Sequence, residues 1–233
     1  ICLTCGTSSE RKEGFMDLNL PIVKPNKDLK RKTGTIDEAF AIYAEKNADT
    51  DVQFCLDQYT CAEILDGENQ YFCNTCNGKR DAKRILKLTE LPPVLNVQLS
   101  RYVFDRTKFI KKKVSDKVLL PTSLIVPTGS EGETKKKYLL CAVMRHQGNS
   151  AYSGHYLAEA MDWLTGTWFE FNDETVKLLP DGPSSSFDPD SVGSDKSSKS
   201  SRPVGSQDAY NMYYVDEDYL VISARTAILW RET

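Results

Sequence analysis

Two Cys-x-x-Cys pairs, Cys2/Cys5 and Cys73/Cys76, constrain what this chain can fold into more than any other feature. Two residues between cysteines let one tight turn direct both sulfur atoms at a single ion, and two such turns complete a tetrahedral site of four thiolates. Soft thiolates favour zinc and leave no position open for water, so the metal would be structural. Residues 6–72 separate the pairs, a longer interval than a compact zinc ribbon uses, so unrelated reduced thiols remain the alternative.

The other three of the seven cysteines lack the helix-start or histidine-adjacent setting that lowers the pKa of a thiol. We therefore expect Cys55, Cys61 and Cys141 to be structural, behaving as small apolar side chains where they are buried. An odd number of cysteines is untypical of a secreted disulfide scaffold and favours a reducing compartment, the cytoplasm or the nucleus.

Charge and hydropathy exclude other classes of function. The formal net charge is −3 and the pI is about 5.6, which argues against direct nucleic-acid binding because a phosphate-binding face usually makes a domain basic. The basic run at residues 111–113 is expected to be a solvated strand end or loop. No apolar run reaches the roughly 18 residues of a membrane span, so no membrane partner is expected.

Hydrophobic periodicity predicts an α+β fold built mainly on an antiparallel sheet. Alternating or continuous apolar runs predict strands over residues 15–22, 84–88, 94–102, 138–145, 155–160, 168–172 and 209–215. Thr35 and Glu38 form a capping-box pattern that predicts a helix over residues 35–44. Residues 45–53 form a polar stretch to which no element is assigned.

The chain divides into four expected segments. Residues 1–90 carry the cysteine pairs with an intervening helical segment, and residues 91–179 carry most of the sheet and both histidines. Residues 180–208 contain ten serines and few apolar groups, too few to offset the entropy of ordering, which predicts a disordered insertion. Residues 209–233 supply a closing strand and a tail.

The two histidines, His146 and His155, lie in one short segment with a glycine near each. Glycine allows backbone to approach a ligand closely, although a lone histidine is more often structural. If residues 155–172 form a hairpin, Asn172 or Asp173 returns beside the imidazole of His155. An acceptor oxygen there would hold the tautomer that a general base needs, as in a cysteine protease.

Several segments of the chain resemble the ubiquitin-specific protease family, in the order in which that family carries them. The resemblance rests on the strand motif at residues 91–102, the histidine box Tyr-Ser-Gly-His-Tyr at 152–156, the segment 168–176, the closing strand 209–215, and the cysteine pairs with residues 67–73.

This resemblance implies a papain-like cysteine protease with fingers and palm, residues 1–90 being the fingers and residues 91–179 the palm. It implies hydrolysis of the bond after the C-terminal glycine of ubiquitin, with ubiquitin and ubiquitinated proteins as partners. By the same resemblance His155 matches the general base and Asn172 the residue that orients it, a role Asp173 shares or takes over. The remaining implied residues are Tyr152, Gly154 and Tyr156 around the channel for the ubiquitin tail, and Cys2, Cys5, Cys73 and Cys76 as ligands of a structural Zn²⁺.

The family's nucleophile lies in a cysteine box upstream of the fingers, and no cysteine of this sequence occupies such a box. We therefore expect the thiol to come from residues of the same protein that precede Ile1, and we expect this chain alone to be almost inactive. The alternatives are an inactive ubiquitin-binding or scaffolding module and a zinc-ribbon nucleic-acid protein, and the acidic pI counts against the second.

Overall fold

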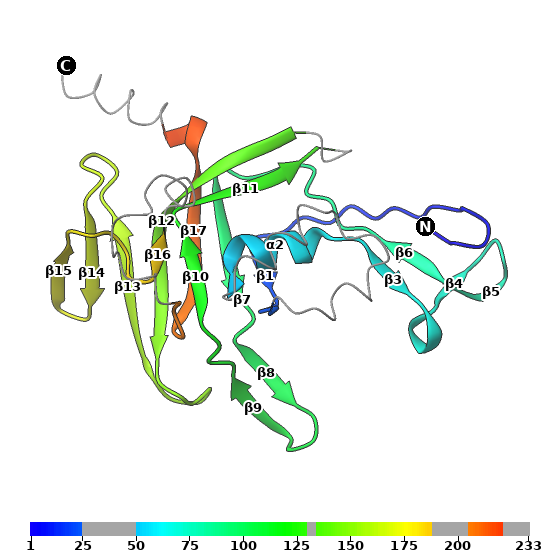
Figure 1. The fold of residues 1–233 in the computed structure, drawn as a ribbon, viewed down its shortest axis with the longest axis horizontal. Coiled ribbons are helices and arrows are strands. Elements are labelled where there is room, and N and C mark those ends of the chain that lie inside the picture. Colours follow the sequence, from blue (N-terminus) through cyan, green and yellow to red (C-terminus); the bar gives the residue numbers. More distant parts are fainter. Residues whose placement is uncertain (25–49, 130–133, 188–204, 221–233) are drawn as a thin grey trace, which may run out of the picture.

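The computed structural model describes residues 1–24, 50–129, 134–187 and 205–220, and the helix expected over residues 35–44 lies outside them (Figure 1). Its largest element is an eight-stranded sheet in the order β1-β7-β17-β12-β13-β14-β15, with β11 paired to β12 off this path. These strands are β1 (Leu18–Leu20), β7 (Val94–Leu99), β11 (Ser123–Thr128), β12 (Thr134–Gln147), β13 (His155–Met161), β14 (Trp168–Asn172), β15 (Thr175–Leu179) and β17 (Ala209–Asp216). Every neighbouring pair is antiparallel except β1 and β7.

The core lies against the centre of this sheet, where β7, β17 and β12 are paired. Leu95, Val97 and Leu99 of β7 are fully buried, while the residues between them are partly exposed. Since side chains alternate between the faces of a strand, this is the burial that the alternation in the sequence predicts. Met212 and Tyr214 of β17 are likewise fully buried and join the same core.

The remaining strands form four small sheets: β2 (Thr50–Asp51) with β10 (Val118–Pro121) and β16 (Ser186–Phe187); β3 (Glu63–Leu65) with β6 (Ala82–Arg84); β4 (Tyr71–Cys73) with β5 (Gly78–Arg80); and β8 (Tyr102–Asp105) with β9 (Ile110–Lys113). The β3/β6 strand pair and the cysteine-bearing β4/β5 hairpin lie beside the N-terminus at one end of the molecule, apart from the large sheet (Figure 1). The β8/β9 hairpin projects from the large sheet as a separate arm.

The described residues contain a helix, α2 (Val52–Thr60), that begins in the stretch the sequence reading left without an element. Asp51 caps it, because its carboxylate Oδ1 accepts a hydrogen bond from the backbone N–H of Phe54 at 2.7 Å. Desolvation raises the pKa of this carboxyl to about 6. Val52 and Leu56 are fully buried in the core, so packing of one helix face stabilises a segment whose local pattern is weak. No helix in the described ranges is long and apolar enough to cross a membrane.

Two expected strands differ in extent from the prediction. The strand expected over residues 15–22 is reduced to β1, since Met16 is 95% exposed and has no face to pack against. The strand expected over 84–88 ends at Arg84, which pairs with Glu63, the first residue of its partner β3.

The expected insertion 180–208 is ordered at both described ends: β16 pairs with β10, and Ser206 is buried and bridges Val118. Backbone pairing and polar contacts to distant residues hold these ends, which is why composition did not reveal them.

Candidate active site and the four-cysteine cluster

The structure brings His155 and Asn172 together across adjacent strands. His155 opens β13 and Asn172 closes β14, and these two strands pair antiparallel. The Nε2 atom of His155 lies 2.5 Å from Oδ1 of Asn172. An amide oxygen only accepts, so Nε2 carries the proton and Nδ1 is left as the basic nitrogen. The side chain of His155 is 44% exposed, which leaves the ring accessible to a reacting group.

Asp173 takes a lesser place at this site. It lies in the turn between β14 and β15, with a φ of 50° that suits such a turn. Its Oδ2 atom is 3.9 Å from Nε2 of His155, and its side chain is 79% exposed. Of the two candidates that the sequence left open, Asn172 makes the short contact, and Asp173 adds a distant, solvent-screened charge.

The loop before His155, residues 147–154, closes tightly on buried His146; we call it the histidine loop. A Cβ built on Gly154 would lie 2.2 Å from Nε2 of His146 and 2.5 Å from the carbonyl oxygen of Gln147. Gly148 has a φ of 134°, and a Cβ there would approach Gly154 Cα to 3.1 Å. Both glycines are therefore required by internal contacts, whereas the sequence reading assigned them to close approach of a ligand.

His146, the residue of β12 that this loop packs against, is structural. It is 4% exposed, and burial lowers its pKa, with the ammonium of Lys113 adding to the effect. Its Nδ1 has no hydrogen-bond partner within the described ranges. A neutral ring packed between Tyr156, at a centroid distance of 4.7 Å, and Tyr102, at 5.7 Å, fits these facts.

The aromatic residues expected around the substrate channel lie on the surface. Tyr152 is 72% and Tyr156 is 52% exposed, and the hydroxyl of Tyr152 accepts a hydrogen bond from the backbone N–H of Lys111 at 3.0 Å. Tyr102 and Tyr210, which the sequence reading did not select, form an edge contact at 5.3 Å beside His146. The one sequence signal that could have selected these two tyrosines was their position at the ends of two predicted strands.

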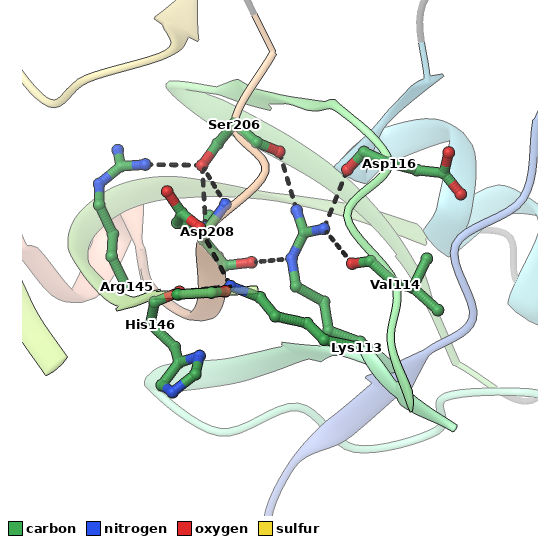
Figure 2. A network of polar contacts seen from close by, with 10 residues as sticks. Lys113, Val114, Asp116, Arg145, His146, Ser206 and Asp208 are labelled. Carbon is green, nitrogen blue, oxygen red and sulfur yellow. Dashed lines mark hydrogen bonds and ion pairs between the residues drawn. The ribbon is translucent and has the colours of Figure 1, made fainter. Parts of the chain in front are cut away.

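A network of buried cations lies behind the histidine loop, and the sequence analysis missed it (Figure 2). Arg101 is fully buried and donates hydrogen bonds to backbone carbonyls of Val114, Asp116, Ser206 and Ala209. Desolvation lowers its pKa to about 10.

Two further cations belong to this network. Arg145 pairs with buried Glu159 at 2.7 Å and donates to Oγ of Ser206 and to the carbonyl of Ser184. Lys113 has a side chain that is 1% exposed, which contradicts the expectation that residues 111–113 are solvated. The physical reason is a set of backbone carbonyls that satisfies the ammonium inside the protein.

The two cysteine pairs meet in one cluster. Sγ atoms of Cys2, Cys5, Cys73 and Cys76 all lie within 4.8 Å of one another, although residues 6–72 separate the pairs in sequence. A hydrogen bond with Thr7 lowers the pKa of Cys5 to about 6, while contact with Cys5 raises that of Cys76 to about 12. Four thiolates packed this closely would repel one another unless a cation neutralised their charge, and the cluster is compatible with binding one metal ion.

The remaining cysteines offer no nucleophile. Burial raises the pKa of Cys55 and of Cys141 to about 11, as expected for structural thiols. Cys61 is exposed. Within the described residues no hydrogen bond joins a thiol to His155, whose partners are Asn172 and Asp173.

Comparison with known proteins agrees with this arrangement. The sequence model of the family described as ubiquitin carboxyl-terminal hydrolase matches residues 20–214. The chain is 44% identical over 126 residues to ubiquitin carboxyl-terminal hydrolase 48 of Danio rerio, covering 54% of this chain and 12% of the relative. It is 37% identical over 182 residues to ubiquitin carboxyl-terminal hydrolase 26 of Oryza sativa subsp. japonica, covering 76% of this chain and 15% of the relative.

Two solved structures show the same fold. The yeast SAGA deubiquitinating module with an Sgf73 mutant matches with a TM-score of 0.64 and 25% identity, over 93% of this chain and 39% of that one. The SAGA deubiquitinating module bound to monoubiquitin matches with a TM-score of 0.60, at the same identity and coverage. The fold, the paired His155 and Asn172, and the family match over most of the sequence together show that this chain belongs to the ubiquitin carboxyl-terminal hydrolase family.

Proposed function

We propose that this chain is the histidine-bearing part of the catalytic domain of a deubiquitinating thiol protease. The observation that carries the proposal is the 2.5 Å contact between Nε2 of His155 and Oδ1 of Asn172, in a chain that belongs to this family. That contact fixes the tautomer in which Nδ1 accepts a proton, which is the requirement for a general base. The nucleophilic cysteine comes from a segment of the same protein that precedes Ile1.

In the intact enzyme the cysteine transfers its proton to Nδ1 of His155, and the thiolate attacks the carbonyl of the last glycine of ubiquitin. The bond after that glycine breaks, the leaving amine takes the proton from His155, and a thioester remains. His155 then accepts a proton from water, which hydrolyses the thioester and releases ubiquitin. Asn172 holds the ring throughout, and the exposed Tyr152 and Tyr156 beside Gly154 border the channel for the ubiquitin tail.

The four-cysteine cluster holds a structural Zn²⁺ within the fingers. Zn–S bonds of about 2.3 Å place thiolates of a tetrahedral site about 3.8 Å apart. Sγ of Cys5 and Sγ of Cys73 lie 3.7 Å apart, which fits that geometry. When bound, the ion neutralises thiolate charge and ties the N-terminal segment to the β4/β5 hairpin; it takes no part in the reaction.

Substrates are ubiquitin and ubiquitinated proteins, since a solved neighbour of this chain is bound to monoubiquitin. The free thiols favour a reducing compartment, the cytoplasm or the nucleus.

The test compares this chain with the same protein extended N-terminally, using a fluorogenic ubiquitin conjugate. We expect hydrolysis by the extended protein alone, and its loss on His155→Gln. Hydrolysis by the 233-residue chain itself would refute the assignment of the nucleophile. An extended protein that binds ubiquitin but never hydrolyses the conjugate would instead establish the inactive binding module.

A further inference from the structure

The side chain of Lys113, at the end of β9, reaches the backbone at the start of the histidine loop. Its Nζ donates to the carbonyl oxygen of His146 at 2.5 Å, to that of Gly148 at 2.7 Å and to Oδ1 of Asp208 at 3.0 Å (Figure 2). An ammonium group has three N–H donors, so each has an acceptor in this arrangement. Satisfied donors explain how an ammonium group on a side chain that is 1% exposed can lie inside the protein.

Asp208 also binds His146, at its backbone N–H rather than at its carbonyl. Its backbone carbonyl accepts a hydrogen bond from the N–H of His146 at 2.9 Å, and its own N–H donates to Oγ of Ser206 at 3.2 Å. His146 is therefore fixed at its N–H by Asp208 and at its carbonyl by Lys113. Asp208, in the described segment that begins at residue 205, is therefore hydrogen-bonded directly to the residues at the start of the histidine loop.

Strand β9 also contacts the far part of the loop, through the hydrogen bond from the N–H of Lys111 to the hydroxyl of Tyr152. The two ends of the loop touch each other, because Gly148 lies against Ser153 and Gly154, and Gln147 pairs with His155 in the sheet. Because the two ends of the loop are in contact, we expect a displacement of its first residues to displace the backbone of His155 as well.

We propose that Lys113 is a positioning residue for His155, which holds the histidine loop by its carbonyls and thereby keeps the imidazole against Asn172. The inference rests on the proposed role of His155 as general base. Loss of the ammonium leaves two carbonyls and a carboxylate without their partner, so the loop relaxes and the ring loses its fixed orientation. Small misplacements of a catalytic group are expensive: about 1 Å costs up to 10²-fold in rate.

The primary experiment measures the His155 ring directly in this chain. The chain contains two histidines, so ring ¹³C relaxation in histidine-labelled protein reports each one separately. Lys113→Met removes the ammonium group while keeping an unbranched side chain that is shorter by one atom, and we expect the order of the His155 ring to fall. Lys112→Met is the matched control, since this neighbour is exposed, and it leaves the ring unchanged. A folded Lys113→Met protein with an unaltered His155 ring would overturn the proposal.

Asp208→Asn keeps an oxygen acceptor for Lys113 and removes only the ion pair, so it provides a second variant should Lys113→Met fail to fold. We expect a smaller fall in His155 ring order, and an unchanged ring in this variant would then refute the proposal.

In the N-terminally extended protein, Lys113→Met is expected to lower kcat by about 10- to 100-fold with little change in KM. Full activity of His155→Gln would refute the proposed function while leaving the ring measurement interpretable. An essential His155 with unchanged ring order in Lys113→Met would refute the positioning role alone.

Discussion

Replacement of Gly154 by alanine separates two explanations for the glycine beside the proposed general base. One is that the ubiquitin tail needs the space, and the other is that His146 occupies it. A Cβ at this position would lie 2.2 Å from Nε2 of His146 and 2.5 Å from the carbonyl oxygen of Gln147. Ordinary contacts between such atoms are about 3.5 Å, so the ring and the carbonyl both have to move by more than about 1 Å.

The cost of that movement is large because His146 is buried and its ring packs between Tyr102 and Tyr156. Overpacking of a well-packed interior typically costs about 1–3 kcal/mol, and we expect Gly154→Ala to lower the free energy of unfolding by about 3 kcal/mol. With a urea dependence of roughly 2–3 kcal/mol per molar for a protein of this size, the unfolding midpoint falls by about 1 M. Equilibrium urea unfolding of the isolated chain, followed by tryptophan fluorescence, measures this shift.

Two comparisons make the experiment decisive. Gly14→Ala adds a Cβ that meets nothing within 4 Å, so its midpoint should match that of the parent. His146→Ala in the Gly154→Ala background removes the ring but not the Gln147 carbonyl, so we expect partial recovery of stability relative to the sum of the single changes. An unchanged midpoint for Gly154→Ala, together with weakened ubiquitin binding, would refute the packing argument and favour the substrate channel.

Three other outcomes follow from the site. We expect about one zinc ion per chain by metal analysis, lost in Cys73→Ser and retained in the exposed control Cys61→Ser; metal retained in Cys73→Ser would contradict the four-thiolate site. In the N-terminally extended protein Asn172→Ala should lower kcat by about 10²-fold or more, whereas Asp173→Ala stays within about threefold, and equal losses would assign the orienting role to both. Because burial lowers the pKa of His146, the unfolded chain protonates it first, so its contribution to stability is present above about pH 6.5 and declines as pH falls below that value. The pH profile of unfolding free energy should therefore be flatter over this range in His146→Gln, and parallel profiles would disprove the assignment.

Local patterns were sufficient for much of the sheet, and they limited the partner of His155 to Asn172 or Asp173. The alternation at Leu95, Val97 and Leu99 predicted their full burial, and a hairpin between the segments carrying His155 and Asn172 predicted their contact. Both inferences depend on strand periodicity and on short connections, which the sequence encodes directly.

The buried cations could not be predicted in the same way. Lys113 and Arg101 are buried because carbonyls of residues far along the chain, such as Ser206 and Ala209, lie within reach in the fold. Every residue has a backbone carbonyl, so the sequence does not show which carbonyls will lie near a basic side chain. Basic side chains are usually solvated. Helix α2 was missed for a related reason, since tertiary packing of Val52 and Leu56 outweighs its weak local signal.

The position of β15 at the free edge of the large sheet has a consequence for the heat resistance of the contact between His155 and Asn172. Asn172 is the last residue of β14, and the strand that covers it, β15, is bordered by no further strand in the described sheet and has exposed Val176 and Leu178. Edge hairpins of this kind fray at free energies well below that of global unfolding. Separation of β14 from β13 near its end would release the amide from His155 while the interior stays intact, so on warming the imidazole of His155 should lose its fixed orientation before the protein loses its fold.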